Sequence, residues 1–115
     1  MSLGITSVVE GEVLVLALVG TITTEDNYYA VKVAIYGAIN SDRRRIVLDL
    51  KEVTEIDYLG WDVILEGFKY VADHSGQLRL VNPQQNVLDY LQITKLDSVF
   101  EVHTSLAAAL TSFAT

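Results

Sequence analysis

The sequence has no cysteine and no long apolar run. Without cysteine the chain has no disulfides, no thiolate catalysis and no cysteine-ligated zinc or iron–sulfur cluster, which is compatible with a reducing compartment. Its longest apolar run, residues 13–19, is far shorter than the about 20 residues that a helix needs to cross a bilayer. The N-terminus also lacks a basic region followed by an apolar signal segment. We therefore expect a cytoplasmic protein that does not insert directly into a membrane.

Positive charge is also scarce. Eight Lys and Arg residues stand against fifteen Asp and Glu residues, which gives a net charge of −7. Such a molecule repels phosphate backbones and anionic lipid head groups, so nucleic acid is not an expected partner. The one basic run, Arg43-Arg44-Arg45, is interpreted as a solvated loop that neutralises helix C-terminal carbonyls rather than as an anion site.

Catalytic groups are sparse as well. The two histidines, His74 and His103, have no nucleophile or carboxylate at a recognisable spacing, and we expect both at the surface. They do not form the His-x-x-x-His pair of a helical metal site, and no glycine-rich phosphate loop is present. The sequence therefore predicts a protein that is not an enzyme and that uses no metal and no cofactor.

Apolar residues make up 50% of the chain and spread over its whole length, which predicts a single domain over residues 1–115. The link Glu10-Gly11-Glu12 between two β-rich runs indicates an antiparallel hairpin. The unbroken Ile46-Val47-Leu48 indicates a central strand that is buried on both faces. We expect strands at residues 5–9, 13–19, 45–50, 77–81 and 99–102.

Helical spacing of apolar residues follows the hairpin and the central strand. The first helix is expected to begin at Thr23 or Thr24, with Glu25 and Asp26 at the positive end of its dipole. Its core stripe consists of Tyr28, Val31, Ile35 and Ala38. A second amphipathic helix is expected over residues 60–75, closed by Gly76.

Two shorter helices are predicted in the C-terminal third. The first follows Asn82-Pro83, which supplies a cap and a proline suited to the first turn, and Thr104 is expected to cap the last. Strands that alternate with helices after an opening hairpin predict an α/β fold. Its mixed, mostly parallel sheet has about five strands and is packed with about four helices.

The most informative segment, IVLDLKEVTEIDYLGW at residues 46–61, is an apolar strand that runs into an aspartate–glycine turn and opens a helix. It resembles the signature of the STAS domain family, the anti-sigma factor antagonists and transporter tails. In that family the segment ends in Asp-Ser-Ser-Gly-Leu, and the second serine is phosphorylated. Here Tyr58, Leu59 and Trp61 stand where the family has Ser, Ser and Leu. The resemblance therefore implies a STAS fold without phosphorylation at the family position, Leu59.

Two interpretations are open for the residues of this segment. Asp57 either caps the helix, which is the structural interpretation, or orders the loop beside the modified position, as in the family. Tyr58, Leu59 and Trp61 form an apolar cluster of the kind found at binding hot spots, unless Trp61 turns inward. Gly60 is expected to permit close packing or an unusual dihedral angle. The predicted partner-binding residues are Thr23, Thr54, Asp57, Tyr58, Leu59, Gly60 and Trp61, with Thr54, Thr23 and Tyr58 as candidate substitutes for the serine.

By this resemblance we expect a non-catalytic regulatory domain that binds a kinase-like anti-sigma factor and acts in bacterial transcription regulation. Without a serine at position 59, release of the partner would need competition, degradation or an unconventional modification. The alternative is a scaffold or accessory STAS subunit of a stress-sensing or lipid-transport complex. A homodimer is compatible with either function.

Overall fold

The computed structural model describes residues 3–23 and 27–113. The elements follow in the order β1 (Gly4–Glu10), β2 (Val13–Ile22), α1 (Tyr28–Asn40), β3 (Arg45–Ile56), α2 (Tyr58–Asp73), β4 (Gln77–Val81), α3 (Gln85–Ile93), a 3-10 turn (Leu96–Ser98), β5 (Glu101–His103) and α4 (Leu106–Phe113). The five strands lie in the order β1-β2-β3-β4-β5. The β1–β2 pair is antiparallel and the other pairs are parallel, which confirms the predicted mixed sheet.

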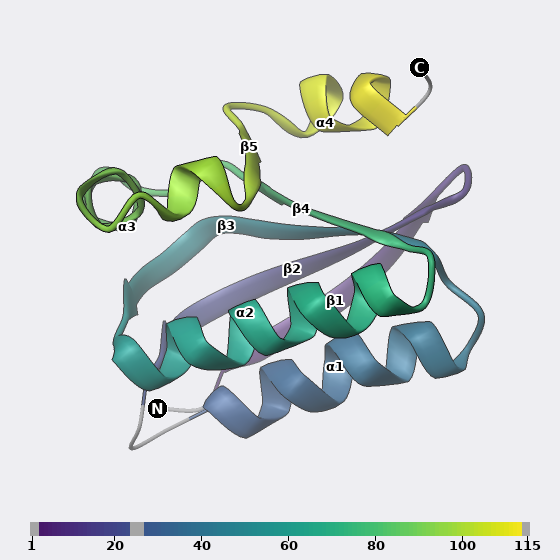
Figure 1. Cartoon of the computed structure of the whole chain (residues 1–115), viewed down its shortest axis with the longest axis horizontal. Helices are drawn as coiled ribbons and strands as arrows, with labels where there is room; N and C mark the ends of the chain where they lie inside the picture. The colour runs from purple at the N-terminus through teal and green to yellow at the C-terminus, as the bar shows by residue number, and fades with distance from the viewer. Residues whose placement is uncertain (1–2, 24–26, 114–115) are drawn as a thin grey trace.

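The sheet has helices on both faces, with α1 and α2 side by side on one and α4 on the other (Figure 1). Alternation along each strand sends residues such as Leu48 to the α1–α2 side and residues such as Val47 to the α4 side. Ile46, Val47 and Leu48 have no exposed surface, so β3 is the central strand that the sequence predicted. No helix in the described part of the chain is both long and apolar enough for a transmembrane span.

The central strand is longer than predicted. β3 continues past Leu50 to Ile56, so Thr54 lies in the strand rather than in a loop. Most residues of this extension are polar, so the two-residue alternation of a strand cannot be recognised in its sequence. Its buried positions, Val53 and Ile56, are three residues apart instead of two. Register shifts against β2 explain this spacing, because each adds a residue on one strand.

The first helix begins later than predicted. Its N-cap is Asn27, in the left-handed conformation with φ of 75°, and Thr23 instead forms an isolated bridge with Asn27. The Asn27 side chain accepts a hydrogen bond from the Leu3 amide and donates one to the Thr21 carbonyl, both at 2.9 Å. Asn27 therefore links the starts of β1 and α1 to the end of β2. The other expected start residues, Thr24, Glu25 and Asp26, lie outside the described residues.

Other helix boundaries also differ from the predictions. Ser75, not Gly76, takes the left-handed conformation after α2. Gly76 serves close packing, because a Cβ there would lie 2.6 Å from the Arg44 carbonyl oxygen. The α4 cap is Ser105 rather than Thr104, since its hydroxyl accepts the Ala108 amide at 3.1 Å.

The proline does not enter the third helix. Asn82 has φ of 57° and Pro83 follows it outside the helix, whose N-cap is Gln84. One part of the interpretation of the basic run is confirmed, because Arg44 donates a hydrogen bond of 3.1 Å to the Ile39 carbonyl near the end of α1. The run is not a solvated loop throughout, since Arg45 is the first residue of β3 and all three arginines are partly buried.

Candidate functional site

The aspartate of the signature segment caps α2. Asp57 has an extended backbone, and its Oδ1 accepts a hydrogen bond of 3.0 Å from the Gly60 amide. This bond satisfies one of the amides that have no partner within the helix, which is the structural role expected of an N-cap aspartate. α2 thus begins at Tyr58, two residues earlier than predicted.

The start of α2 is also joined to the end of β2. The Asp57 amide donates a hydrogen bond of 3.1 Å to the Ile22 carbonyl oxygen. A Cβ at Gly60 would lie 2.3 Å from the same oxygen, so only glycine fits the approach of helix to strand. Position 60 therefore requires glycine because of close packing and not because of a positive φ. Thr23, the residue after Ile22, is brought beside the cap by this connection.

The apolar cluster of the signature segment divides between core and surface. Trp61 is 3% exposed and its ring stacks on Tyr90 of α3, with centroids 5.6 Å apart and planes 2° apart. Tyr58 is 68% exposed and Leu59 is partly exposed. Trp61 therefore holds α2 against α3, while Tyr58 presents its side chain to solvent and Leu59 is partly exposed beside it.

The backbone of Thr54 is joined to the start of α3. Its carbonyl accepts a hydrogen bond of 2.9 Å from the Asn86 side chain at the start of α3, and Thr54 is exposed on β3. We define the α2 N-terminal surface as Thr23, Thr54, Asp57, Tyr58 and Leu59. Gly60 and Trp61 lie beneath it and are buried.

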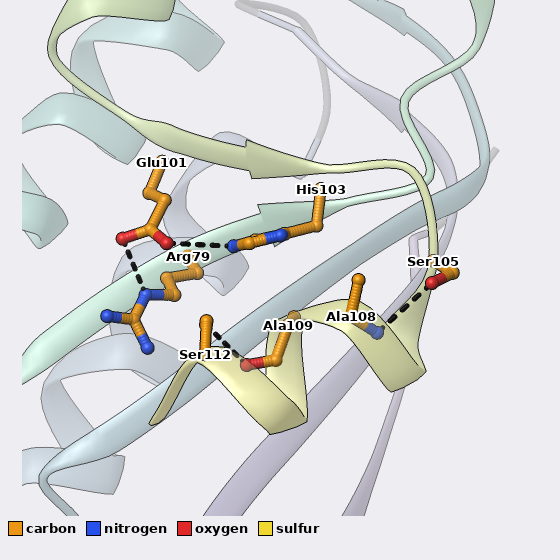
Figure 2. Close-up of polar contacts among 7 residues, drawn as sticks. All are labelled: Arg79, Glu101, His103, Ser105, Ala108, Ala109 and Ser112. Atoms are coloured by element: carbon orange, nitrogen blue, oxygen red, sulfur yellow. Dashed lines mark hydrogen bonds and ion pairs between the residues drawn. The ribbon is translucent and has the colours of Figure 1, made fainter. Parts of the chain in front are cut away.

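A second polar cluster was not predicted. On the opposite side of the sheet from α2, Arg79 Nε donates a 2.8 Å hydrogen bond to Glu101, whose other oxygen lies 2.9 Å from His103 Nε2 (Figure 2). The Arg79 guanidinium also lies over the Phe113 ring of α4, at 3.9 Å from its centroid. The cluster thus anchors α4 to the sheet. No local sequence pattern indicates this cluster, because only the parallel register of β4 and β5 places Arg79 opposite Glu101.

The expectation that both histidines lie at the surface is confirmed for His74, which is exposed. His103 is only partly accessible, since its side chain is 19% exposed and pairs with Glu101. Burial raises the pKa of the Glu101 carboxyl, but the hydrogen bonds from His103 and Arg79 and their charges outweigh it, so the pKa lies below the usual value of a glutamate. Among the described residues, no group of three His, Asp or Glu side chains is arranged to hold a metal ion.

The arrangement of elements is shared with solved structures. A putative anti-sigma factor antagonist from Thermotoga maritima superposes with a TM-score of 0.90 at 22% identity, over 96% of this chain and 95% of the other. An anti-sigma factor antagonist from Mycobacterium paratuberculosis gives a TM-score of 0.88 at 20% identity, over 99% and 96%. The murine anion transporter Solute Carrier 26 family member A9 gives 0.75 at 18% identity, over 90% of this chain and 18% of the transporter.

These likenesses concern the fold, since the identities are low. No curated protein matches the chain. The STAS domain family matches residues 5–109, which include every strand from Ile5 onward and the α2 N-terminal surface. The chain therefore belongs to the STAS domain family, with a fold like that of the anti-sigma factor antagonists.

Proposed function

We propose that this chain is a non-catalytic regulatory domain that binds a kinase-like anti-sigma factor through the α2 N-terminal surface. The observation that carries the proposal is the exposure of Tyr58, 68%, beside the partly exposed Leu59. Both residues lie on the first turn of a helix that Asp57 caps. A partner that docks here meets aromatic and aliphatic side chains whose backbone is already fixed, which lowers the entropy cost of binding.

At position 59 the same surface lacks the short hydroxyl of the family switch. Phosphorylation of a serine would add about −1.5 to −2 charges at the centre of the contact and expel an apolar or acidic partner. Leu59 has no atom that accepts a phosphoryl group. Tyr58 carries its hydroxyl at the end of a phenol ring, further from the backbone than a serine hydroxyl. Binding by this chain is therefore not ended by phosphorylation at the family position, residue 59.

A capture experiment with a matched control tests the proposal. The immobilised domain, a Leu59→Glu variant and an Ile93→Glu variant are each exposed to native lysate, and the retained proteins are identified. Ile93 is the last residue of α3 and is 81% exposed. Its substitution therefore adds the same charge outside the α2 N-terminal surface. We expect a kinase-like protein on the wild type and on Ile93→Glu, and its loss from Leu59→Glu. Equal retention by all three would contradict the proposal.

A scaffold or accessory function is the second candidate. The chain superposes on 18% of the length of the murine anion transporter, so a domain of this fold can be a small part of a much larger membrane protein. This function predicts that the domain purifies with a transporter or within a high-order assembly. Capture of a soluble kinase-like protein by the wild type favours the first candidate instead.

A further inference from the structure

The first helix of the protein is apolar on two opposite faces. Val31 and Ile35 face the core together with Ala38 and Ile39. On the opposite side Tyr29 is 62% exposed and Val33 is 54% exposed. By contrast, the solvent side of α2 carries charged residues, as is usual for a surface helix. The exposed face of α1 therefore requires an explanation that folding of the monomer does not supply.

This face is hollowed at a glycine. Gly37 is exposed, and a Cβ placed on it has no atom within 4 Å. The hollow is lined by Tyr29, Lys32, Val33, Tyr36, Gly37 and Asn40. A mid-helix glycine in an ordinary conformation lowers helix stability relative to alanine. Its lack of a side chain does, however, leave room for a large group from another molecule.

The large and small residues of the face are arranged symmetrically about Val33. Tyr29 lies four residues before Val33 and Gly37 four residues after it. If two copies of α1 pack antiparallel about a two-fold axis at Val33, with the axis perpendicular to the row of these three residues, Tyr29 of each copy faces Gly37 of the other. Each Tyr29 ring then meets a position that has no side chain.

The charge of the helix favours a second copy over another partner. Lys32 is the single charged residue in α1, although the chain as a whole has a net charge of −7. Its ammonium group lies 5.5 Å from the Tyr36 ring centroid, and Tyr36 is in turn stacked on Tyr70 of α2 at 4.0 Å. Two copies can meet on this face without bringing carboxylates together, whereas an oppositely charged partner has little to recognise.

We propose that the exposed face of α1 is a dimerisation surface, on which two copies of this chain pack their α1 helices antiparallel about a two-fold axis at Val33. This inference goes beyond the proposed function and does not depend on it. A single helix pair buries less than the about 1,200–2,000 Å² of a standard stable interface. We therefore expect a reversible dimer with a dissociation constant of about 10–100 µM.

Charge exchange at residue 33 tests both the surface and the symmetry. Val33→Glu and Val33→Lys each place like charges on the axis, so sedimentation of either variant alone is expected to give a dissociation constant at least about 100-fold higher than that of the wild type. An equimolar mixture of the two variants is expected to form a heterodimer again, because the opposite charges then face each other. A mixture that stays monomeric would overturn the two-fold arrangement.

Two further variants guard against indirect effects. Gly37→Gln fills the hollow without adding charge, and the open space around Gly37 leaves the monomer fold intact. We expect at least about tenfold weaker dimerisation. Ala72→Glu adds one charge at an exposed position of α2 and should leave dimerisation unchanged. A wild-type protein that is monomeric at about 500 µM would overturn the proposal. So would a Val33→Glu protein that dimerises as tightly as the wild type, or an Ala72→Glu protein that dimerises less tightly.

Discussion

The amide of Asp57 donates a 3.1 Å hydrogen bond to the carbonyl oxygen of Ile22, which joins the start of α2 to the end of β2. The side chain of Asp57 meanwhile accepts the Gly60 amide at 3.0 Å. Two strand ends and a helix start are thereby held at one point, because β3 also ends at Ile56. The side chains that follow, exposed Tyr58 and partly exposed Leu59, are presented from a backbone fixed on both sides.

The approach of α2 to β2 makes Gly60 sensitive to a single methyl group. A Cβ at this position would lie 2.3 Å from the Ile22 carbonyl oxygen, and backbone cannot move aside easily. We expect Gly60→Ala to lower the free energy of unfolding by about 2–3 kcal/mol in urea titrations. Gly37→Ala is the matched control and should raise it by about 0.5–1 kcal/mol, because Gly37 is exposed and open. Similar values for the two variants would refute this explanation of Gly60.

The two interpretations of Asp57 can be separated by substitution. Asp57→Ala removes the cap and should lower the free energy of unfolding by about 1 kcal/mol, whereas Asp57→Ser keeps a capping oxygen and most of the stability. If the role of Asp57 is structural, Asp57→Ser also keeps the partner that the wild type captures. Loss of that partner by a stable Asp57→Ser protein would instead assign the carboxylate a direct part in recognition.

The pairing of Arg79 with Glu101 predicts an acid-sensitive contribution to stability. The folded state lowers the pKa of Glu101, so the contribution is fully present above the pKa that this glutamate has in the unfolded chain and is lost as the pH falls through the lower folded-state pKa. At neutral pH we expect Glu101→Gln to cost about 1 kcal/mol, a small value because the Glu101 side chain is 50% exposed. Chemical denaturation of both proteins at several pH values measures this difference, which should shrink in acid. A difference that does not change with pH would contradict the assignment.

The sequence predicted the order of the elements well, because each buried stripe follows a simple period. Val31, Ile35 and Ala38 recur at helical spacing and all are buried, and the Ile46-Val47-Leu48 run is buried on both faces. The extension of β3 to Ile56 was missed because the register shifts against β2 interrupt the two-residue alternation. Helix starts were also misplaced, since several small polar residues near each start are equally suitable caps by composition.

The candidate site was predicted in part, for a similar reason. The capping role of Asp57 and the inward orientation of Trp61 were both among the interpretations that the sequence allowed. The close approach of Gly60 to Ile22 depends on how two distant segments pack, so spacing alone cannot reveal it. The cluster of Arg79, Glu101 and His103 likewise depends on the register of two parallel strands.

The most direct test of the proposed function is the dissociation constant for the captured kinase-like protein, measured with and without ATP and followed by intact mass determination. We predict the same dissociation constant in both conditions and no phosphoryl group on the chain, because Leu59 occupies the family position. A Leu59→Ser variant is the positive control, in which ATP should weaken binding. If ATP weakens binding of the wild type at least about tenfold and residues 54–61 gain a phosphoryl group, the account is contradicted.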